Sequence, residues 1–188
     1  MPEIKVTYFD KPGPDNTDAT LRIAKQRADE LGIDTIVVAT TFGSTGIKAA
    51  EVFKGKKVVA VTHFTGFAAP NEQQVSPENK KAMERAGVIV HTASHAFTGV
   101  GGAMRKKFNT YDTDDLVSSV FRIFGQGMKV CAEISLMAAD AGLVPVDRDV
   151  IAIAGTGRGA DTAVVLQPAN LRDFFDLKIK EILCKPRL

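Results

Sequence analysis

Short apolar runs rich in β-branched residues alternate with helical patterns along most of the chain, and this alternation restricts the fold more than any other feature. It is typical of a parallel sheet covered by helices on both faces. We therefore predict an α/β protein in which continuous apolar strands are buried on both faces. The runs predicted as strands are 4–9, 34–41, 57–63, 87–94, 149–155, 161–168 and 175–182, the last of them half-exposed.

Helical spacing of apolar residues fills most of the intervals between these strands. The first predicted helix begins at Asn16 or Thr17 and runs to Leu31, with Gly32 at its end, and the second covers 44–53. The third begins at the cap Ser76 with Pro77 in its first position. The segment 113–142 forms one helix or two, because Gly125 and Gly127 interrupt its pattern. Two segments, 64–77 and 95–113, have little periodicity. We predict long loops there, of the kind that compact domains use for function or leave mobile.

The length of 188 residues fits a single domain, 1–188, with a core that needs no disulfide or metal. Cys131 and Cys184 lie outside any CxxC pattern, so we interpret both as apolar core residues and predict no metal site. The formal net charge of +2 is too small for a nucleic-acid partner. No leader pattern and no apolar run of about 20 residues is present, so we expect a cytoplasmic protein with no membrane partner.

Hydroxyl groups and glycines follow the strand 34–41 in the stretch "TTFGSTG". A helix that begins near Ser44 leaves its first N–H groups unpaired and carries a partial positive charge there, so an anion fits this end. We predict a phosphate-binding loop in which glycines let the ligand approach and hydroxyls donate to it; the alternative is a cap that serves only its own helix. Neither the P-loop spacing nor a GxSxG nucleophile elbow is present. The loop comprises Thr40, Thr41, Gly43, Ser44, Thr45 and Gly46.

A second glycine cluster follows the strand 149–155 and matches GxGxxA. The dinucleotide-binding fingerprint requires a helix next, but here β-branched residues continue to Pro168. We therefore predict a loop between two strands whose glycines allow close approach. Arg158 would face an anion there, or alternatively point to solvent. The loop residues are Gly155, Thr156, Gly157, Arg158 and Gly159.

Loops that leave the carboxyl ends of parallel strands meet at one edge of the sheet, where ligands bind at the point of reversed strand order. We predict that a pocket forms at this edge between the two glycine loops. Its other predicted lining residues are His63, Phe64, Ser94 and His95. This mixture suits an aromatic ring that carries a phosphate, with Phe64 and Phe67 either stacking on the ring or simply packing.

The histidines and the basic run "MRKKF" (104–108) give weaker indications of function than the two glycine loops. His91 and His95 have no cysteine or carboxylate to complete a metal site. His63 could act as an acid or base near neutral pH, but the sequence identifies no partner for it, so no catalytic residue is assigned. The basic run is interpreted as a solvated face, and contact with an anionic ligand is the alternative.

The order of these features resembles a known family. The run "DTIVVATTFGSTGIKAAEVFKGKKVVAVTH" resembles the start of the C-terminal domain of pyruvate kinase, and "SPENKKAMERAGVIV" resembles its next helix and strand. The run "GMKVCAEISLMAADAGLVPVDRDVIAIAGTGRGADTAVV" is similar to its final helix, a strand, the glycine loop and the closing strand. The likeness covers about 16–168. The N-terminal strand, the loops 64–77 and 95–113, and the tail after Pro168 depart from the family.

The resemblance implies a three-layer α/β/α sandwich with a mixed, mostly parallel sheet and an antiparallel strand near the C-terminus. In pyruvate kinase this domain binds a phosphorylated effector, so by resemblance the loop 41–46 holds a phosphate and the loop 155–161 closes over it. The catalytic barrel has no counterpart, and we expect no pyruvate kinase catalysis. The chain also resembles small stand-alone archaeal relatives that are associated with flavin mononucleotide (FMN).

We therefore expect a protein that binds a phosphorylated small molecule, FMN in first place, rather than an enzyme. Two alternatives stay open. One is a flavin-dependent oxidoreductase with His63 or His95 near the ring. The other is a structural module without a ligand, since the pyruvate kinase domain also forms subunit contacts. The same resemblance leads us to expect a homo-oligomer.

Overall fold

The protein is described by a computed structural model that covers residues 3–187. Within this range the chain forms one seven-stranded sheet with the order β1-β7-β6-β5-β2-β3-β4. Only β6 runs antiparallel to its neighbours β5 and β7, which confirms the predicted mixed sheet. The strands are β1 (Thr7–Phe9), β2 (Thr35–Ala39), β3 (Lys57–Thr62), β4 (Ile89–Thr92), β5 (Val150–Ala154), β6 (Thr162–Gln167) and β7 (Lys178–Pro186).

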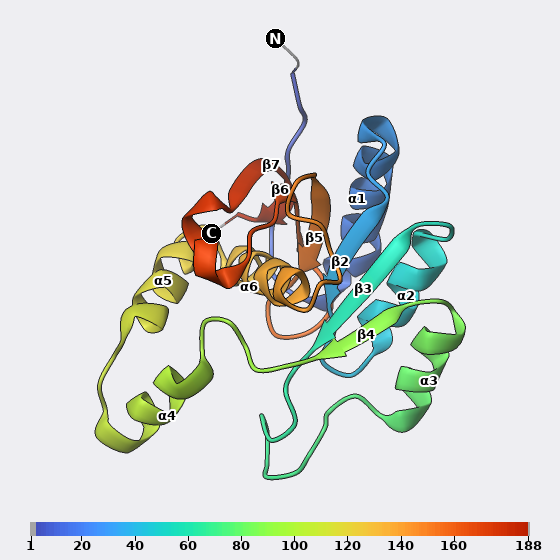
Figure 1. Cartoon of the computed structure of the whole chain (residues 1–188). Coiled ribbons are helices and arrows are strands. Elements are labelled where there is room, and N and C mark those ends of the chain that lie inside the picture. Colours follow the sequence, from blue (N-terminus) through green and yellow to red (C-terminus); the bar gives the residue numbers. More distant parts are fainter. Residues whose placement is uncertain (1–2, 188) are drawn as a thin grey trace.

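Helices cover both faces of the sheet, as Figure 1 shows. The helices α1, α2 and α3 lie on one face, above a core cluster that includes Leu21, Phe53 and Met83. The helix α6 lies on the other face, above a cluster that includes Met128 and Cys131. The three-layer α/β/α architecture is therefore confirmed. The helices are α1 (Thr17–Leu31), α2 (Ser44–Val52), α3 (Pro77–Arg85), α4 (Gly99–Phe108), α5 (Thr113–Arg122) and α6 (Gln126–Asp140), with short 3₁₀ turns η1 (Pro14–Asn16) and η2 (Leu171–Asp176).

Local signals in the sequence place several helix ends correctly. The hydroxyl of Ser76 accepts a hydrogen bond from the Asn79 amide at 3.2 Å, and Pro77 opens α3. Helix α1 ends at Gly32, whose φ of 65° is in the left-handed region that glycine adopts without strain. Both cysteines are buried and free, and burial raises the pKa of the Cys184 thiol to about 11. They are apolar core residues, as predicted.

The segment 95–113, predicted as a loop, contains the helix α4, so that prediction is wrong. Three glycines within four positions lower the intrinsic helix propensity by about 1 kcal/mol each, which hides the helix from a sequence argument. Gly101 has a packing reason: a Cβ there would lie 1.8 Å from the Asp112 carboxylate oxygen. The helical pattern over 113–142 divides into α5 and α6 at Gly125, whose φ of 120° interrupts the helix. The loop 64–77 is irregular as predicted.

Candidate functional site

The candidate site lies where the strand order reverses. The chain passes from β2 to β3 and β4 on one side, whereas β5 pairs with the other side of β2. The loops after β2 and β5 therefore leave neighbouring strands at the same carboxyl edge of the sheet. This is the position at which open α/β sheets bind ligands. The two glycine segments thus lie on one rim.

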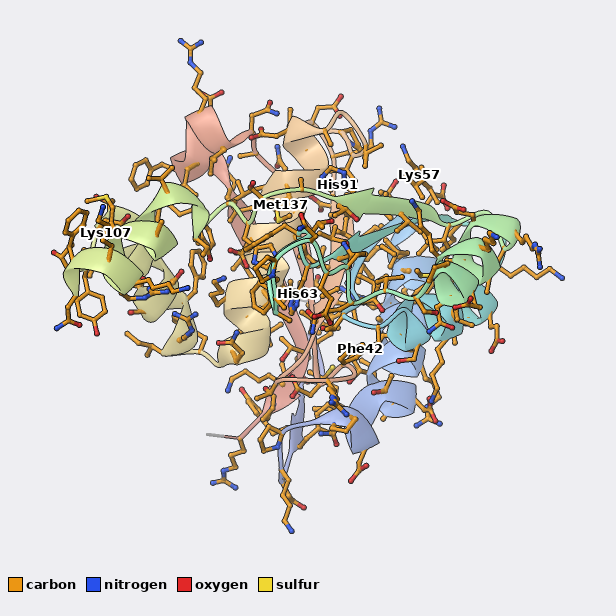
Figure 2. All side chains as sticks on the ribbon, turned by 90° about the horizontal axis from the view of Figure 1, so that it is seen from below. Phe42, Lys57, His63, His91, Lys107 and Met137 are labelled. Carbon is orange, nitrogen blue, oxygen red and sulfur yellow. The ribbon has the colours of Figure 1, made fainter. Side chains whose placement is uncertain are left out.

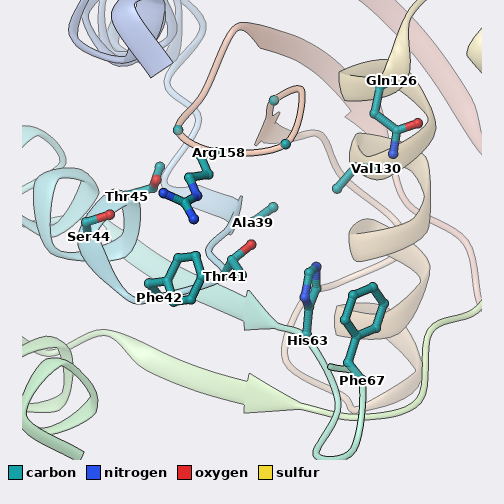
Figure 3. Close-up of a pocket in the computed structure, with 13 residues that line it drawn as sticks. Ala39, Thr41, Phe42, Ser44, Thr45, His63, Phe67, Gln126, Val130 and Arg158 are labelled. Carbon is teal, nitrogen blue, oxygen red and sulfur yellow. The ribbon is translucent and has the colours of Figure 1, made fainter. Parts of the chain in front are cut away.

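Two adjoining cavities open at this edge. The first, drawn in Figure 3, has a volume of about 260 Å³, and the second has a volume of about 270 Å³. They share six lining residues, so together they reach the size range of small-molecule pockets. The first cavity is lined by Ala39, Thr41, Phe42, Ser44, Thr45, His63, Phe67, Gln126, Val130, Gly155, Gly157, Arg158 and Gly159. The second adds Thr40, Val61, Thr62, His95, Thr98, Arg105, Arg122, Lys129, Glu133 and Ile134 to the shared residues.

The amino end of α2 faces the first cavity. The Thr40 hydroxyl oxygen accepts hydrogen bonds from the amides of Gly43 and Gly46, at 3.1 and 3.3 Å. Thr40 therefore has the capping role that was the alternative to ligand binding. Among the described residues, the amides of Ser44 and Thr45 have no acceptor. Two adjacent N–H groups with the positive end of the helix dipole behind them are thus free for an oxyanion.

A positive side chain lies across from these amides. Arg158 belongs to the loop after β5, and its guanidinium carbon lies 5.1 Å from the centre of the Phe42 ring. Figure 3 shows the guanidinium directed toward the start of α2, near Thr45. Within residues 3–187 Arg158 forms no ion pair, and no carboxylate lines the first cavity. The first cavity is therefore positively charged.

The buried carboxylate of Asp161 holds the glycine loop in place. Its Oδ2 accepts from the Gly13 amide at 2.9 Å and from the Thr156 amide at 3.1 Å, and its Oδ1 accepts from the Thr162 hydroxyl at 2.8 Å. The sequence analysis did not identify Asp161. Its three bonds connect the N-terminal segment, the loop and β6, so they hold the start of the loop that carries Arg158 against its neighbours.

Most glycines of the two loops are required by the protein's own packing rather than by a ligand. At Gly43 φ is 99°, and a Cβ would lie 2.6 Å from the Asn79 Cβ. A Cβ at Gly46 would lie 2.4 Å from the Met83 sulfur, so this glycine lets α2 pack on α3. Gly155 and Gly159 similarly approach backbone atoms of their own chain. Only Gly157 in its loop has open space around it, and it lines the first cavity.

An aromatic cluster closes the side of the cavities opposite Arg158. It consists of His63, Phe64, Phe67 and His95. The His63 and Phe67 ring centres lie 3.9 Å apart, and the exposed Phe67 lines both cavities. The Nδ1 of His63 is 2.7 Å from the Gln74 side-chain oxygen, which supplies the partner that the sequence did not identify. A flat ring could stack on Phe67 here.

The second cavity contains a buried ion pair that the sequence analysis missed. Lys129 pairs with Glu133 one turn along α6, and the other Glu133 oxygen accepts from the Phe97 amide at 3.0 Å. Burial lowers the pKa of the Lys129 ammonium, and burial is also the main reason why the pKa of His95 is lowered. Charged residues at helical spacing within the apolar pattern of 126–140 were the signal that could have indicated this pair.

The predicted site residues divide into three groups. Those that line the first cavity are Thr41, Ser44, Thr45, His63, Gly155, Gly157, Arg158 and Gly159. Thr40 and His95 line only the second cavity. Five predicted residues line neither cavity: Gly43, Gly46, Phe64, Ser94 and Thr156. The two glycines contact α3, Phe64 packs in the aromatic cluster, and the Thr156 amide donates to Asp161.

Within residues 3–187, no three His, Cys, Asp or Glu side chains come together as they would around a metal ion. In the same range, every helix is too short or too polar to cross a bilayer.

Several pyruvate kinase structures are similar to this chain at low sequence identity. A pyruvate kinase of Cryptosporidium parvum is 13% identical, with 81% of this chain and 23% of that chain covered at a TM-score of 0.44. A second structure of the enzyme from this organism is 14% identical (85% and 23% covered, TM-score 0.43), and its complex with ADP is also 14% identical (84% and 24% covered, TM-score 0.42). This chain therefore spans about a quarter of those chains.

The match to a protein family is more extensive. The family model for the pyruvate kinase alpha/beta domain matches residues 18–166. This range runs from the first turn of α1 to the end of β6 and includes both glycine loops. The chain therefore belongs to the pyruvate kinase alpha/beta domain family.

Proposed function

We propose that this chain binds a phosphorylated small molecule with a flat ring, FMN in first place, across the two adjoining cavities. The observation that carries the proposal is the pair of unpaired amides at Ser44 and Thr45, which lie opposite Arg158 at the strand-order reversal. The donors suit a phosphate group, and Phe67 and His63 offer a surface for a ring. Each cavity alone is small, so the ring would have to extend from the first cavity into the second.

Energetic considerations favour a ligand larger than phosphate. The helix end contributes up to about 2 kcal/mol, and hydrogen bonds to a charged group contribute about 1.5 to 3 kcal/mol each. Association costs at least about 4 kcal/mol, which offsets much of this gain. Free phosphate would therefore bind weakly, and useful affinity requires burial of the rest of the ligand. A phosphorylated aromatic molecule satisfies this requirement.

A comparison of FMN with riboflavin tests the proposal directly, because riboflavin has the same ring but no phosphate. We expect the chain to bind FMN at least about tenfold more tightly than riboflavin, the equivalent of about 1.4 kcal/mol. Calorimetry or flavin fluorescence measures both affinities, and the visible spectrum of the isolated protein shows whether flavin copurifies. Equal affinities for the two flavins would refute the phosphate site. Absence of binding by both, together with no response to other phosphorylated rings, would refute the ligand class.

A second candidate function, flavin-dependent oxidoreduction, is favoured by the position of His95. This side chain lines the second cavity, and burial lowers its pKa, which favours the neutral ring, whose free nitrogen can accept a proton. FMN, when bound, would supply the hydride chemistry, while His95 would exchange protons beside it. The test is reduction of the bound flavin by NADH or NADPH. A flavin that stays oxidised with both donors would leave binding as the function.

A further inference from the structure

The second cavity carries more positive than negative side chains. Three arginine or lysine side chains and one carboxylate line it, namely Arg105, Arg122, Lys129 and Glu133. Lys129 pairs with Glu133. Arg105 pairs with Asp115, which lies outside the lining. Arg122 forms no ion pair within residues 3–187, so among these residues one positive charge of the cavity is left without a partner.

A neutral contact orients the unpaired arginine. Arg122 ends α5, and its Nε donates to the side-chain oxygen of Gln126 at 2.8 Å. Gln126 begins α6 and lines both cavities. Because an amide is uncharged, this bond orients the guanidinium without neutralising it, and the two terminal nitrogens have no acceptor in the described part of the chain. The two terminal nitrogens of a guanidinium can bind both oxygens of a carboxylate.

A second cation lies close to Arg122. Burial lowers the pKa of the Lys129 ammonium, and the charge of Arg122 lowers it further, while Glu133 opposes both effects. The side chains of Arg122 and Lys129 are thus near enough to repel each other, and both line the same cavity. The ammonium has three N–H groups, and Glu133 is its one hydrogen-bond acceptor among the described residues. An anion bound between the two cations would offset their repulsion and use the remaining donors.

The adjoining part of α5 contains a buried hydroxyl without a partner. Ser118 is 2% exposed, and its Oγ has no hydrogen-bond partner among residues 3–187. Ser118 and Arg122 are one turn apart on the same side of α5, next to the apolar side on which Val117 and Phe121 pack. Buried hydroxyls are nearly always hydrogen-bonded, to protein or to an ordered molecule. This hydroxyl is a second sign, separate from the charges, of a polar guest beside α5.

The other arginine of the cavity comes from α4. Arg105 belongs to the basic run 104–108, every residue of which is exposed, in agreement with the interpretation of this run as a solvated face. Figure 2 shows Lys107 of the run at the margin of the molecule, away from His63. Arg105 nevertheless lines the second cavity. Because Asp115 neutralises it, Arg105 can add a hydrogen bond to a guest but no unpaired charge.

We infer that the second cavity binds a carboxylate, held by Arg122 with Lys129 beside it. The one unpaired positive charge matches the single charge of a carboxylate, whereas a phosphate carries more than one negative charge at pH 7 and would be repelled by the buried Glu133. His63 and Phe67 line both cavities and could support the ring of an aromatic acid. The carboxylate belongs either to the ring of the phosphorylated ligand or to a second molecule beside it. The site itself does not depend on the proposed function, because no phosphate donor of the first cavity takes part in it.

Benzoate and benzamide test the site, because they have the same ring and a similar shape but only benzoate is charged. We expect the chain to bind benzoate at least about tenfold more tightly than benzamide, and we expect Arg122→Gln to lose this preference. NMR titration measures both affinities, and circular dichroism checks that the variants are folded. The matched control is Arg148→Gln, which alters another exposed arginine that lines neither cavity and should keep the preference. Equal binding of the two probes by the wild type, absence of binding by both, or a preference kept in Arg122→Gln would overturn the inference.

Two further titrations separate this site from the phosphate site. Arg158→Gln should keep the preference for benzoate, because Arg158 lines only the first cavity; a preference lost there and kept in Arg122→Gln would place the acid in the first cavity and overturn the inference. In protein saturated with FMN, benzoate should still bind if the acid is a second molecule, and FMN should exclude it if the carboxylate belongs to the ring of the ligand. Both results support a carboxylate site and differ only in the molecule that carries the group. If FMN does not bind, the proposed function fails while the benzoate result still stands.

Discussion

The two cavities share six lining residues, but the remaining residues of each differ in kind. The first is made of backbone amides at the start of α2, a glycine loop and an exposed arginine, all at strand ends. The second is made largely of side chains from α6 and the aromatic cluster, including the buried pair Lys129 and Glu133. The difference suggests a division of tasks: the first cavity presents free donors and a positive side chain, whereas the second contains buried charges that must stay paired with each other. Four predictions test this division, from the largest expected effect to the smallest.

Removal of Glu133 should have the largest effect, on stability. The variant Glu133→Ala leaves the Lys129 ammonium buried without its partner and the Phe97 amide without its acceptor. We expect the free energy of unfolding to fall by about 3 to 5 kcal/mol. Denaturant titration measures it. The matched double variant Lys129→Met/Glu133→Leu removes both charges and should recover much of the loss; if it is as unstable as Glu133→Ala, the unpaired charge is not the cause.

Replacement of Arg158 should affect binding and leave stability nearly unchanged. Arg158 is exposed, so Arg158→Gln loses no buried contact, but the ligand phosphate loses a charge-assisted hydrogen bond worth about 1.5 to 3 kcal/mol. We expect FMN affinity to fall by about 10- to 100-fold and riboflavin affinity to stay the same. Calorimetry provides both values. The control is Arg148→Gln, another exposed arginine that lines neither cavity; equal losses in both variants would contradict a specific role for Arg158.

Removal of the Thr40 hydroxyl should show the reverse pattern. Thr40→Val keeps the side-chain shape but deprives the Gly43 and Gly46 amides of their acceptor. We expect a loss of about 1 to 2 kcal/mol in unfolding free energy, as for other helix caps. FMN affinity should change little, since the Ser44 and Thr45 amides remain free. A binding loss as large as that of Arg158→Gln would mean that Thr40 contacts the ligand.

The smallest effect concerns pH. Burial, opposed in part by Glu133, lowers the pKa of His95 below its ordinary value of about 6.5. The unfolded chain therefore binds a proton at His95 more readily than the folded protein does. The stability that neutral His95 contributes is fully present above about pH 6.5, and it is lost as the pH falls through the lower pKa of the folded protein. His95→Gln should therefore flatten the stability profile on the acid side. His91, whose pKa burial also lowers, provides the control His91→Gln for separating the two contributions. An unaltered profile in His95→Gln would contradict the assignment.

Parts of the site that rest on backbone chemistry could be predicted from the sequence. The first amides of a helix have no intrahelical acceptor, and among the described residues those of Ser44 and Thr45 stay unpaired while Thr40 accepts from those of Gly43 and Gly46. The interpretation of individual residues was less successful. Gly43 and Gly46 looked like openings for a ligand, but their neighbours are Asn79 and Met83 of α3. Nothing near Gly46 in the sequence indicates where Met83 will pack.

The charged pair of the second cavity was missed for a related reason. Lys129 and Glu133 lie in a strongly apolar helix, where a sequence argument expects charged residues on the solvated face. The structure turns them inward because His95, Phe97 and the loop after β4 cover that part of α6. The helix α4 was hidden for a different reason, since its glycines are poor helix formers and the contact of Gly101 with Asp112 is not visible in the sequence of the predicted loop.

By itself, the sequence determined the α/β alternation, the caps at Ser76 and Gly32, and the presence of two glycine loops that follow strands. These features depend on backbone sterics and hydrogen bonds within a few residues, which a short window of sequence contains. Only the tertiary structure decided that β5 lies beside β2, so that Arg158 faces the amides of α2, and that a charged pair lies buried behind them. Strand order and burial depend on the packing free energy of the whole chain, which cannot be evaluated from a short segment of sequence.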